Sequence, residues 1–529
     1  MGRKEITRRQ FLQGSAAGAA TLAAMSILGT GAAAEETTEA SAGTSAESES
    51  FNATSNEGLT TVDTSAMKAL SADVAVIGGG GAGIAAAIAA SEAGKNVILM
   101  EKNGMLGGAT ILSGGIIPAT GTDEQIAYGV TDDTVGANAR DILRPNNYSV
   151  RQELVYTVAE KGKDMVEWLR GMGVKWTLMD SLFYGQSEHR MHLADGAGAG
   201  MTTTMIDHLK TLENVTIMTT CEVKGLLVDN GTVIGCYGTD ENDEDFALTA
   251  TNTVLASSGY GNNDEMIKEY CPEVESAVRI VAPGATGEGI KWGEQLGANI
   301  ANMGAYQGYA FHTVDNDKSG EQGVLNNGGI FVNEQGKRFV NEYGGYSELT
   351  PHVLAQSNHQ CWCIFTDIQK DLSSKYAEWE EAGIVFKGDT VEDLAKAIDV
   401  DVDALTKTID TYKAGIENGE DVFNRSKLPE NFDGPYYAVR NTGEIRHTQG
   451  GVSTDVGAHV LRPDGTLIPG FYAAGGCTEG FSSGDGAAYM SGNGLMQALI
   501  YGKIAGTNAA TETPDTAKVV TWEYSDIDA

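Results

Sequence analysis

The segment VNEYGGYSE, residues 340–348, places two tyrosines and two glycines directly after an Asn-Glu pair. One interpretation is a glycine turn between an extended segment and a helix, with the tyrosines packed against it. The other is that Tyr346 lies where a reaction needs a proton, because a phenol can act as a general acid. The rest of the chain must decide between the two.

A second segment, residues 72–102, has the spacing of a dinucleotide-binding motif. It reads ADVAVIGGGGAGIAAAIAASEAGKNVILMEK and predicts a strand, a turn, an alanine-rich helix and a second strand. The GxGxxG turn lets the backbone approach a pyrophosphate at the helix N-terminus. Glu101 ends the second strand, where a carboxylate can bind ribose hydroxyls. The glycines of the turn are Gly78, Gly80 and Gly83.

Three later glycine-rich segments indicate FAD rather than a nicotinamide cofactor. GGATILSGG, residues 107–115, can supply backbone amides to a flavin ring, and residues 251–263 predict a strand against the same nucleotide. Residues 470–506 predict a strand, a glycine loop and a helix whose N-terminus favours negative charge on the flavin. The other predicted FAD contacts are Ala82, Lys102, Gly108, Ala109, Thr110, Ser113, Gly114, Gly115, Gly476, Asn493, Gly494 and Leu495.

Charge and the first residues bear on location and partners. The formal charge of −36 opposes binding to nucleic acid or to an anionic membrane. TRRQFLQG, residues 7–14, precedes a short Gly/Ala-rich apolar run and three alanines at 32–34. This arrangement resembles a twin-arginine signal. We therefore expect a soluble protein exported to the periplasm or cell surface.

Residues 72–510, taken together, resemble the flavoprotein family of fumarate reductases, urocanate reductase and 3-ketosteroid dehydrogenases. The resemblance implies non-covalent FAD, because no histidine precedes the GGAT loop to tether it. A second Rossmann fingerprint is missing, so we expect no NADH site. The spacing of Cys361 and Cys363 does not suit zinc, and no metal site is expected.

The expected fold class is α/β, with a Rossmann-like FAD-binding domain and an inserted α+β capping domain. Within the cap we predict a hairpin that pairs residues 330–333 with residues 338–341. The predicted segments are a signal peptide (1–34), a disordered linker (35–70), the FAD-binding domain (71–262 and 431–512), the capping domain (263–376), a helical segment (377–430) and a C-terminal tail (513–529).

The resemblance also assigns four substrate positions. Tyr346 stands four residues after the Asn-Glu pair, and Tyr489 stands in a Gly-x-x-Tyr-x-x-Gly-Asn setting. The family's fumarate reductases carry arginine at both places. Tyr309 occupies a third position, where they carry histidine. His447 in RHTQGG matches the family's substrate-facing histidine. Arg338 is interpreted as structural.

The two missing arginines decide the expected chemistry. Their loss removes about 3–6 kcal/mol of charge-assisted hydrogen bonding to a dicarboxylate, so fumarate is a poor substrate. Aromatic walls suit a flat apolar molecule. We expect reduction of a C=C bond conjugated to a carbonyl in an enone or enoate. The hydride would come from FAD N5 and the proton from Tyr346, while His447 polarises the carbonyl.

Three alternatives stay open: a 3-ketosteroid-type dehydrogenase that works in the oxidative direction, a fumarate- or urocanate-type reductase, and a non-catalytic flavin electron carrier. The expected partners are a small-molecule electron acceptor and a separate cytochrome or quinol-linked electron donor. Membrane association is expected only through that donor.

Overall fold

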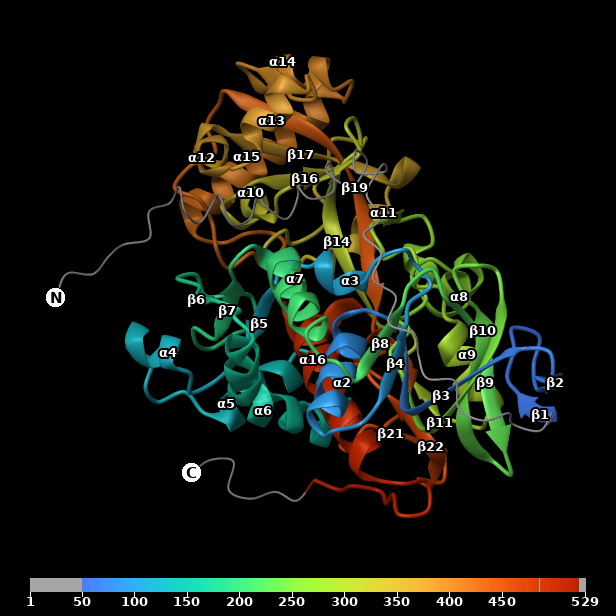
Figure 1. Cartoon of the computed structure of the whole chain (residues 1–529). Coiled ribbons are helices and arrows are strands. Elements are labelled where there is room, and N and C mark those ends of the chain that lie inside the picture. The colour runs from blue at the N-terminus through green and yellow to red at the C-terminus, as the bar shows by residue number, and fades with distance from the viewer. Residues whose placement is uncertain (1–49, 485, 523–529) are drawn as a thin grey trace.

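A computed structural model describes residues 50–484 and 486–522 (Figure 1). The predicted signal peptide, the first part of the linker and the last residues of the tail lie outside this range. The described residues form an FAD-binding-type domain, which carries both ends of the described chain, and a second lobe drawn above it in Figure 1.

A ten-stranded sheet organises the first domain, and β3 lies near its middle between β11 and β4, parallel to both. Its main path is β2 (Thr60–Asp63), β1 (Ser50–Ala53), β9 (Glu222–Asp229), β10 (Thr232–Thr239), β11 (Asp245–Leu255), β3 (Lys68–Ile77), β4 (Val97–Met100) and β8 (Val215–Met218). The strand β22 (Leu467–Ala473) pairs with β11 and with β21 (His459–Leu461).

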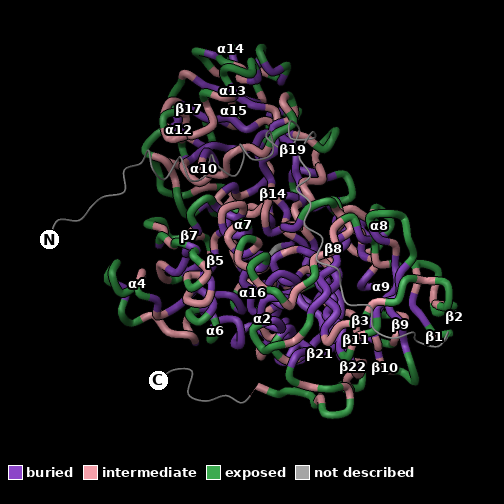
Figure 2. Tube along the Cα trace, viewed as in Figure 1, coloured by how far each residue is buried: buried purple, intermediate pink, exposed green. Residues whose placement is uncertain are grey.

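Two helices pack together in the interior of this domain, α2 (Gly81–Glu92) and α16 (Asn493–Thr511) (Figure 2). Small residues bring them close, since a Cβ added at Gly506 would collide with the backbone of Ala86. Alanine-rich α2 is buried along almost its whole length, as expected of a helix between a sheet and another helix. The two helices run in the same direction, with Gly502 in the middle of α16 against Ala82 at the start of α2.

Further helices and short strands complete this domain. The helices are α3 (Gly108–Ile111), α4 (Asp123–Tyr128), α5 (Val135–Leu143), α6 (Gln152–Gly171), α7 (Ala197–Leu209), α8 (Asp264–Tyr270) and α9 (Glu288–Gln295). Short strands form two small sheets, one of β5 (Ile116–Pro118), β7 (Met191–Ala194) and β6 (Trp176–Leu178), the other of β13 (Ile300–Ala301) and β20 (Gly451–Val452).

The cap is built on a seven-stranded sheet around the long strand β19. The sheet contains β15 (Lys318–Ser319), β14 (Tyr306–Thr313), β19 (Tyr436–Thr448), β17 (Gln360–Thr366) and β16 (Ile330–Val332), with β12 (Val278–Arg279) and β18 (Phe386–Gly388) paired to β19. Its helices are α10 (Gln322–Asn326), α11 (Leu349–Leu354), α12 (Asp367–Leu372), α13 (Tyr376–Glu381), α14 (Val391–Ala397) and α15 (Val402–Asn418).

The cap extends further along the chain than predicted. The helices over 377–430 pack on β16, β17 and β19 in one hydrophobic core, so they belong to the cap and are no separate segment. Strand β19 was expected in the FAD-binding domain from residue 431, but it pairs with β17 and β14. The chain returns to the first domain only after Thr448, because β19 supplies the middle of the cap sheet.

Two further predictions were wrong. The expected disordered linker contains β1 and β2 within residues 50–63, and β1 pairs with β9. Edge strands need few apolar side chains, and Ala53 is the one buried residue within β1 and β2. In the predicted hairpin, residues 338–341 form no strand, and β16 pairs with β17 instead. Side chains of this segment turn into a buried ion network described below.

Within the described residues, no helix is both long and apolar enough to span a bilayer. All six cysteines lie within the described ranges, where each is buried with a free thiol.

Candidate active site

The start of α2 forms a backbone cradle of the kind a phosphate needs. Gly78 has φ +110°, and a Cβ at Gly83 would collide with its carbonyl oxygen, so both positions require glycine. A Cβ added at Gly80 would meet only Gly108 Cα, 3.8 Å away, which leaves space beside the helix start. The N-cap residue, Gly80, has no side chain to cap α2. Apart from the Gly81 amide, which donates to Thr110 Oγ1, the first amides of α2 fit a pyrophosphate.

The predicted GGAT loop lies against this cradle. The Gly107 amide donates to Gly79 O at 2.8 Å, and the Gly81 amide donates to Thr110 Oγ1 at 3.1 Å. Ser113 Oγ donates to Thr110 O and accepts from the Gly115 amide. These bonds hold Gly108, Ala109 and Gly114 in one loop beside the start of α2.

Glu101 and Lys102 differ in how they fit the predicted cofactor role. The Glu101 carboxylate is buried at the end of β4, where it accepts from the Gly79 amide at 2.7 Å and from the Asn103 amide at 2.8 Å. It is thereby oriented beside the glycine turn. Lys102 Nζ donates to Thr286 Oγ1 at 2.6 Å and pairs with Glu288 of α9 at 3.3 Å. Its amine is committed to these partners, so its predicted FAD contact is not supported by the side chain.

The start of α16 closes the other end of the cradle. Gly476 lies against Gly259. No side chain caps α16, and Asn493 Oδ1 is buried without a hydrogen-bond partner, so it could accept a hydrogen bond from a flavin N–H. A Cβ at Gly494 would approach His447 Nε2 to 3.0 Å. The residues therefore fit a flavin between the two helix N-termini, with Leu495 in the first turn of α16.

The four predicted substrate residues do gather at one place. Ring centroids lie 5.5 Å apart for Tyr309 and Tyr346, 5.8 Å for Tyr346 and Tyr489, and 5.8 Å for Tyr489 and His447. The Tyr346 phenol oxygen lies 2.8 Å from Ser491 Oγ, next to the start of α16. Tyr309 lies on β14 and His447 on β19, and those strands are paired. We call these four residues the tyrosine cluster.

Backbone contacts fix the loop that carries Tyr346. The Ala310 amide donates to Tyr346 O at 3.1 Å, and the Gly308 amide donates to Ser347 Oγ at 2.8 Å. Thr350 Oγ1 also donates to Tyr346 O at 3.1 Å. The loop is thus attached to β14 on one side and to α11 on the other, which favours a positioned phenol over a loosely packed turn tyrosine.

His447 is oriented by a short chain of polar side chains. Gln449 Nε2 lies 3.1 Å from His447 Nε2, and Ser482 donates to Gln449 Oε1. With Gln449 as donor, His447 Nε2 is the acceptor and its proton is on Nδ1. Both Gln449 and Ser482 are buried. The imidazole is therefore held in one tautomer.

Arg338 lies away from the cluster, in the ion network of the cap. Its guanidinium pairs with Glu342 Oε2 at 2.6 Å and with Asp421 Oδ1 at 2.6 Å, and Arg425 lies 3.4 Å from the same Glu342 oxygen. Glu342 Oε1 also accepts from the Phe331 amide. The interpretation of Arg338 as structural agrees with these contacts.

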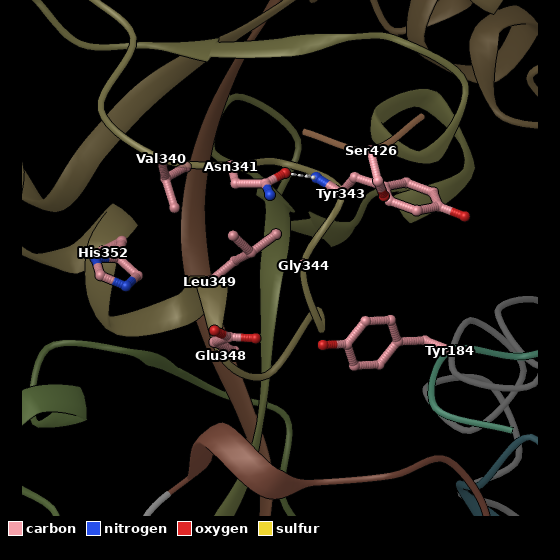
Figure 3. Close-up of a pocket in the computed structure, with 9 residues that line it drawn as sticks. All are labelled: Tyr184, Val340, Asn341, Tyr343, Gly344, Glu348, Leu349, His352 and Ser426. Atoms are coloured by element: carbon pink, nitrogen blue, oxygen red, sulfur yellow. Dashed lines mark hydrogen bonds between the residues drawn. The ribbon is translucent and has the colours of Figure 1, made fainter. Parts of the chain in front are cut away.

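A cavity of about 300 Å³ is lined by residues of the loop that carries Tyr346 (Figure 3). Tyr184 of the FAD-binding domain points across it toward Glu348 of the cap, and an added Cβ at Gly345 would lie 3.2 Å from the Tyr184 ring. Asn341, Tyr343 and His352 also line it. Tyr346 is not part of this wall.

Comparison with known proteins gives the family. A family model described as an FAD binding domain matches residues 73–495. The chain belongs to this family of FAD-binding flavoproteins. The predicted FAD cofactor and fold class are thereby confirmed. A twin-arginine translocation signal sequence matches residues 5–25, which confirms the predicted export route.

Relatives of the flavoprotein support the family resemblance. It is 32% identical to a fumarate reductase (cytochrome) of Shewanella frigidimarina over 83% of this chain and 77% of the relative. It is 31% identical to the urocanate reductase of Eggerthella lenta over 86% and 75%. A flavocytochrome c3 fumarate reductase solved in an open conformation has a TM-score of 0.72 and 30% identity, over 84% of this chain and 78% of that chain.

Burial controls the charge states in the flavoprotein's tyrosine cluster. It raises the pKa of Tyr346 and, much more, that of Tyr489, so both phenols carry their protons at neutral pH. Burial, followed by the nearby Arg446 charge, lowers the pKa of His447 to about 4. At neutral pH the cluster therefore offers phenol donors and a neutral imidazole.

Three polar residues in contact with the cluster were missed at the sequence level: Arg446, Gln449 and Ser491. Arg446 lies with its guanidinium 5.0 Å from the Tyr309 ring centroid. Both Arg446 and Gln449 stand inside the RHTQGG motif that identified His447, and Ser491 stands two residues after Tyr489. Proximity to a matched motif was the available signal, but which neighbours face the site depends on the packing of two domains.

Proposed function

We propose that this flavoprotein reduces a C=C bond conjugated to a carbonyl group, with Tyr346 as the proton donor. The observation that carries the proposal is the position of the Tyr346 phenol, 2.8 Å from Ser491 beside the start of α16 and within a cluster of three tyrosines and a neutral histidine. A buried, protonated phenol beside the expected flavin position is suited to general acid catalysis.

Each residue of the cluster has its own role in the proposed reaction. When bound, FAD in its reduced form supplies the hydride for one carbon of the double bond. Tyr346 breaks its O–H bond and gives the proton to the carbon next to the carbonyl. His447 donates from Nδ1 to the carbonyl oxygen and stabilises the negative charge that develops there. Tyr309 and Tyr489 supply aromatic walls.

The substrate class follows from what the cluster offers. Among the described residues, Arg446 is the one arginine with a ring contact to the cluster, and a single guanidinium, paired with Glu444, does not replace the two arginines that would hold a dicarboxylate. Neutral phenols and aromatic rings favour a flat, conjugated molecule with at most one carboxylate. We infer an enone or an aryl enoate in preference to fumarate, although the relatives named above include a fumarate reductase.

Electrons must reach the flavin from a separate donor in this proposal. The family match covers an FAD-binding domain, and a twin-arginine signal directs export, where NADH is not supplied. A cytochrome or a quinol-linked protein fits this setting. The substrate then acts as a terminal electron acceptor.

Anaerobic reoxidation of the dithionite-reduced holoprotein tests the proposal. Fumarate, urocanate, cinnamates and 3-keto-Δ4-steroids are each added, and flavin absorbance is followed for the natural protein and for Tyr346→Phe. We expect rapid reoxidation by an enone or aryl enoate and a loss of roughly a hundredfold or more in the variant. Rapid reoxidation by fumarate, or an unaffected Tyr346→Phe variant, would contradict the proposal.

The same experiment separates the alternatives. If oxidised holoprotein is reduced by a saturated ketosteroid faster than reduced protein is reoxidised by the enone, the enzyme is a dehydrogenase. If no compound of the panel exchanges electrons with the flavin but a cytochrome does, the protein is an electron carrier.

A further inference from the structure

A buried ion network approaches the tyrosine cluster from the side of the cap sheet. Glu444 of β19 is fully buried and accepts hydrogen bonds from Ser319 Oγ at 3.0 and 2.9 Å. It also pairs with Arg446, two residues along the same strand. Arg446 Nη2 donates to Ser319 Oγ at 2.9 Å. The guanidinium is thus held at two points.

The far side of Glu444 is held by a histidine. His312 Nδ1 lies 2.7 Å from Glu444 Oε2, and its Nε2 lies 3.0 Å from Asp317 Oδ1. Carboxylates only accept hydrogen bonds, so both ring nitrogens carry protons and His312 is an imidazolium. Glu444 is therefore shared between two cations, His312 and Arg446. Its negative charge neutralises the Arg446 guanidinium only in part.

The guanidinium is aimed at the tyrosine cluster. Arg446 Cζ lies 5.0 Å from the Tyr309 ring centroid, and the Tyr309 ring packs 5.5 Å from that of Tyr346. Its charge favours the ionised form of Tyr346 and opposes the effect of burial on the pKa of that phenol. No other arginine or lysine within residues 50–484 and 486–522 has a ring contact with a member of the cluster.

The positive charge of Arg446 can stabilise the phenolate that the proposed reaction leaves on Tyr346. When Tyr346 gives its proton to carbon, the O–H bond breaks, a C–H bond forms and a phenolate remains in a buried position. An uncompensated buried anion is costly, and a fixed cation lowers that cost without reorganisation. The proton returns to the phenolate from solvent after product leaves.

We infer that Arg446 is a positioning residue for this reaction, which acts through Tyr346 by stabilising the phenolate, and that Glu444, Ser319 and His312 hold it in place. The inference rests on the proposed function of Tyr346. A salt bridge that only stabilised the cap would leave the reaction rate of the folded protein unchanged. The proposed role instead predicts that loss of Arg446 slows the reaction, and that this effect depends on the Tyr346 hydroxyl.

The test is a double-mutant cycle on single-turnover reoxidation of the reduced holoprotein, with saturating amounts of the fastest acceptor in the panel. Arg446→Met should slow reoxidation by roughly tenfold or more, less than the loss of a directly bonded donor. Arg446→Lys keeps the charge and should restore much of the rate. In the Tyr346→Phe background, Arg446→Met should cause no further loss.

The matched control is Arg440→Met. Arg440 lies on β19, as Arg446 does, and pairs with Asp315 at the surface. Its substitution should leave the reoxidation rate unchanged. His312→Gln provides a second variant that keeps Arg446 and should slow reoxidation less than Arg446→Met. Thermal unfolding and flavin content identify variants that fail to fold.

Other results would overturn either the proposed function or the role of Arg446. If Tyr346→Phe reoxidises at the natural rate, the proposed function fails. If Tyr346→Phe is slow but Arg446→Met is not, or if the two losses multiply in the double variant, the inference about Arg446 fails alone. If Arg446→Met raises KM only for carboxylate acceptors and leaves kcat unchanged, Arg446 binds substrate directly and the inference is wrong.

Discussion

The Tyr346 phenol oxygen in the cap lies 2.8 Å from the Ser491 hydroxyl oxygen in the FAD-binding domain. This hydrogen bond joins the cap loop to the residue that lies two positions before α16. Contact between the cap and the FAD-binding domain therefore fixes the position of the Tyr346 phenol. In the proposed reaction, this contact would couple cap closure to the placement of the proton donor.

Ser491→Ala removes the bond to Tyr346 but leaves the phenol in place. A hydrogen bond of this type is worth about 0.5–1.5 kcal/mol, so reoxidation at saturating acceptor should slow by roughly twofold to thirteenfold. The rate is measured by flavin absorbance. Ser65→Ala, on the exposed turn after β2, serves as the control. A loss as large as that of Tyr346→Phe would mean that Ser491 itself takes part in proton transfer.

His447 should not impose an acid limb near its ordinary pKa of about 6.5. Burial and the nearby Arg446 charge lower its pKa to about 4, so the imidazole stays neutral above that value and gains a proton only as pH falls through it. The reoxidation rate should therefore show no His447-dependent break between pH 5.5 and 8, because the whole of that range lies above the lowered pKa of about 4. A break near 6.5 that disappears in His447→Gln would contradict this.

Gly80→Ala should weaken FAD binding while the apoprotein still folds. The added Cβ would meet only Gly108 Cα at 3.8 Å, but it would occupy the space expected for the pyrophosphate. Gly83→Ala should prevent folding, because its Cβ would collide with Gly78 O. Gly171→Ala, with open space around it, is the control. Flavin content and circular dichroism distinguish the outcomes, and full flavin in Gly80→Ala would place the cofactor elsewhere.

Arg338→Met should destabilise the cap without changing substrate affinity. The variant leaves Glu342 and Asp421 as buried carboxylates with one cation fewer, a change that costs about 3–5 kcal/mol. Urea unfolding followed by tryptophan fluorescence measures the loss, and KM is measured on the folded fraction. A raised KM with unchanged stability would instead assign Arg338 to the substrate.

FAD should be released when the protein is unfolded. The sequence has no histidine before the GGAT loop, which predicts non-covalent binding. Heat or acid denaturation followed by ultrafiltration should leave free FAD in the filtrate. Yellow colour retained in the precipitate would indicate a covalent link, and peptide mapping would locate it.

Local patterns predicted the nucleotide-binding unit well. The second predicted strand, which ends at Glu101, corresponds to β4, and the predicted turn and helix correspond to the start and length of α2. Such units are recognisable because strand, glycine turn and helix are adjacent in the chain, and each depends on its own residues. The resemblance then indicated four positions that the fold brings together, from four separate segments.

The limits of the cap were harder to predict because its sheet is assembled from distant segments. β19 pairs with β14 and β17, which end 123 and 70 residues before it begins, and nothing within residues 436–448 tells which domain the strand joins. The strands β1 and β2 were missed for a related reason, since an edge strand takes its stability from its neighbour and not from its own apolar pattern.

The sequence by itself determined the FAD-binding family, the export signal and the residue types at the predicted substrate positions. Only the tertiary structure decided that Tyr346 faces Ser491, that Gln449 orients His447 and that Arg446 reaches the Tyr309 ring while Glu444 is shared with His312. Motifs encode contacts that are local or shared with a bound cofactor. Contacts between the cap and the FAD-binding domain arise from the packing of segments far apart in the chain, and that packing is a property of the whole fold.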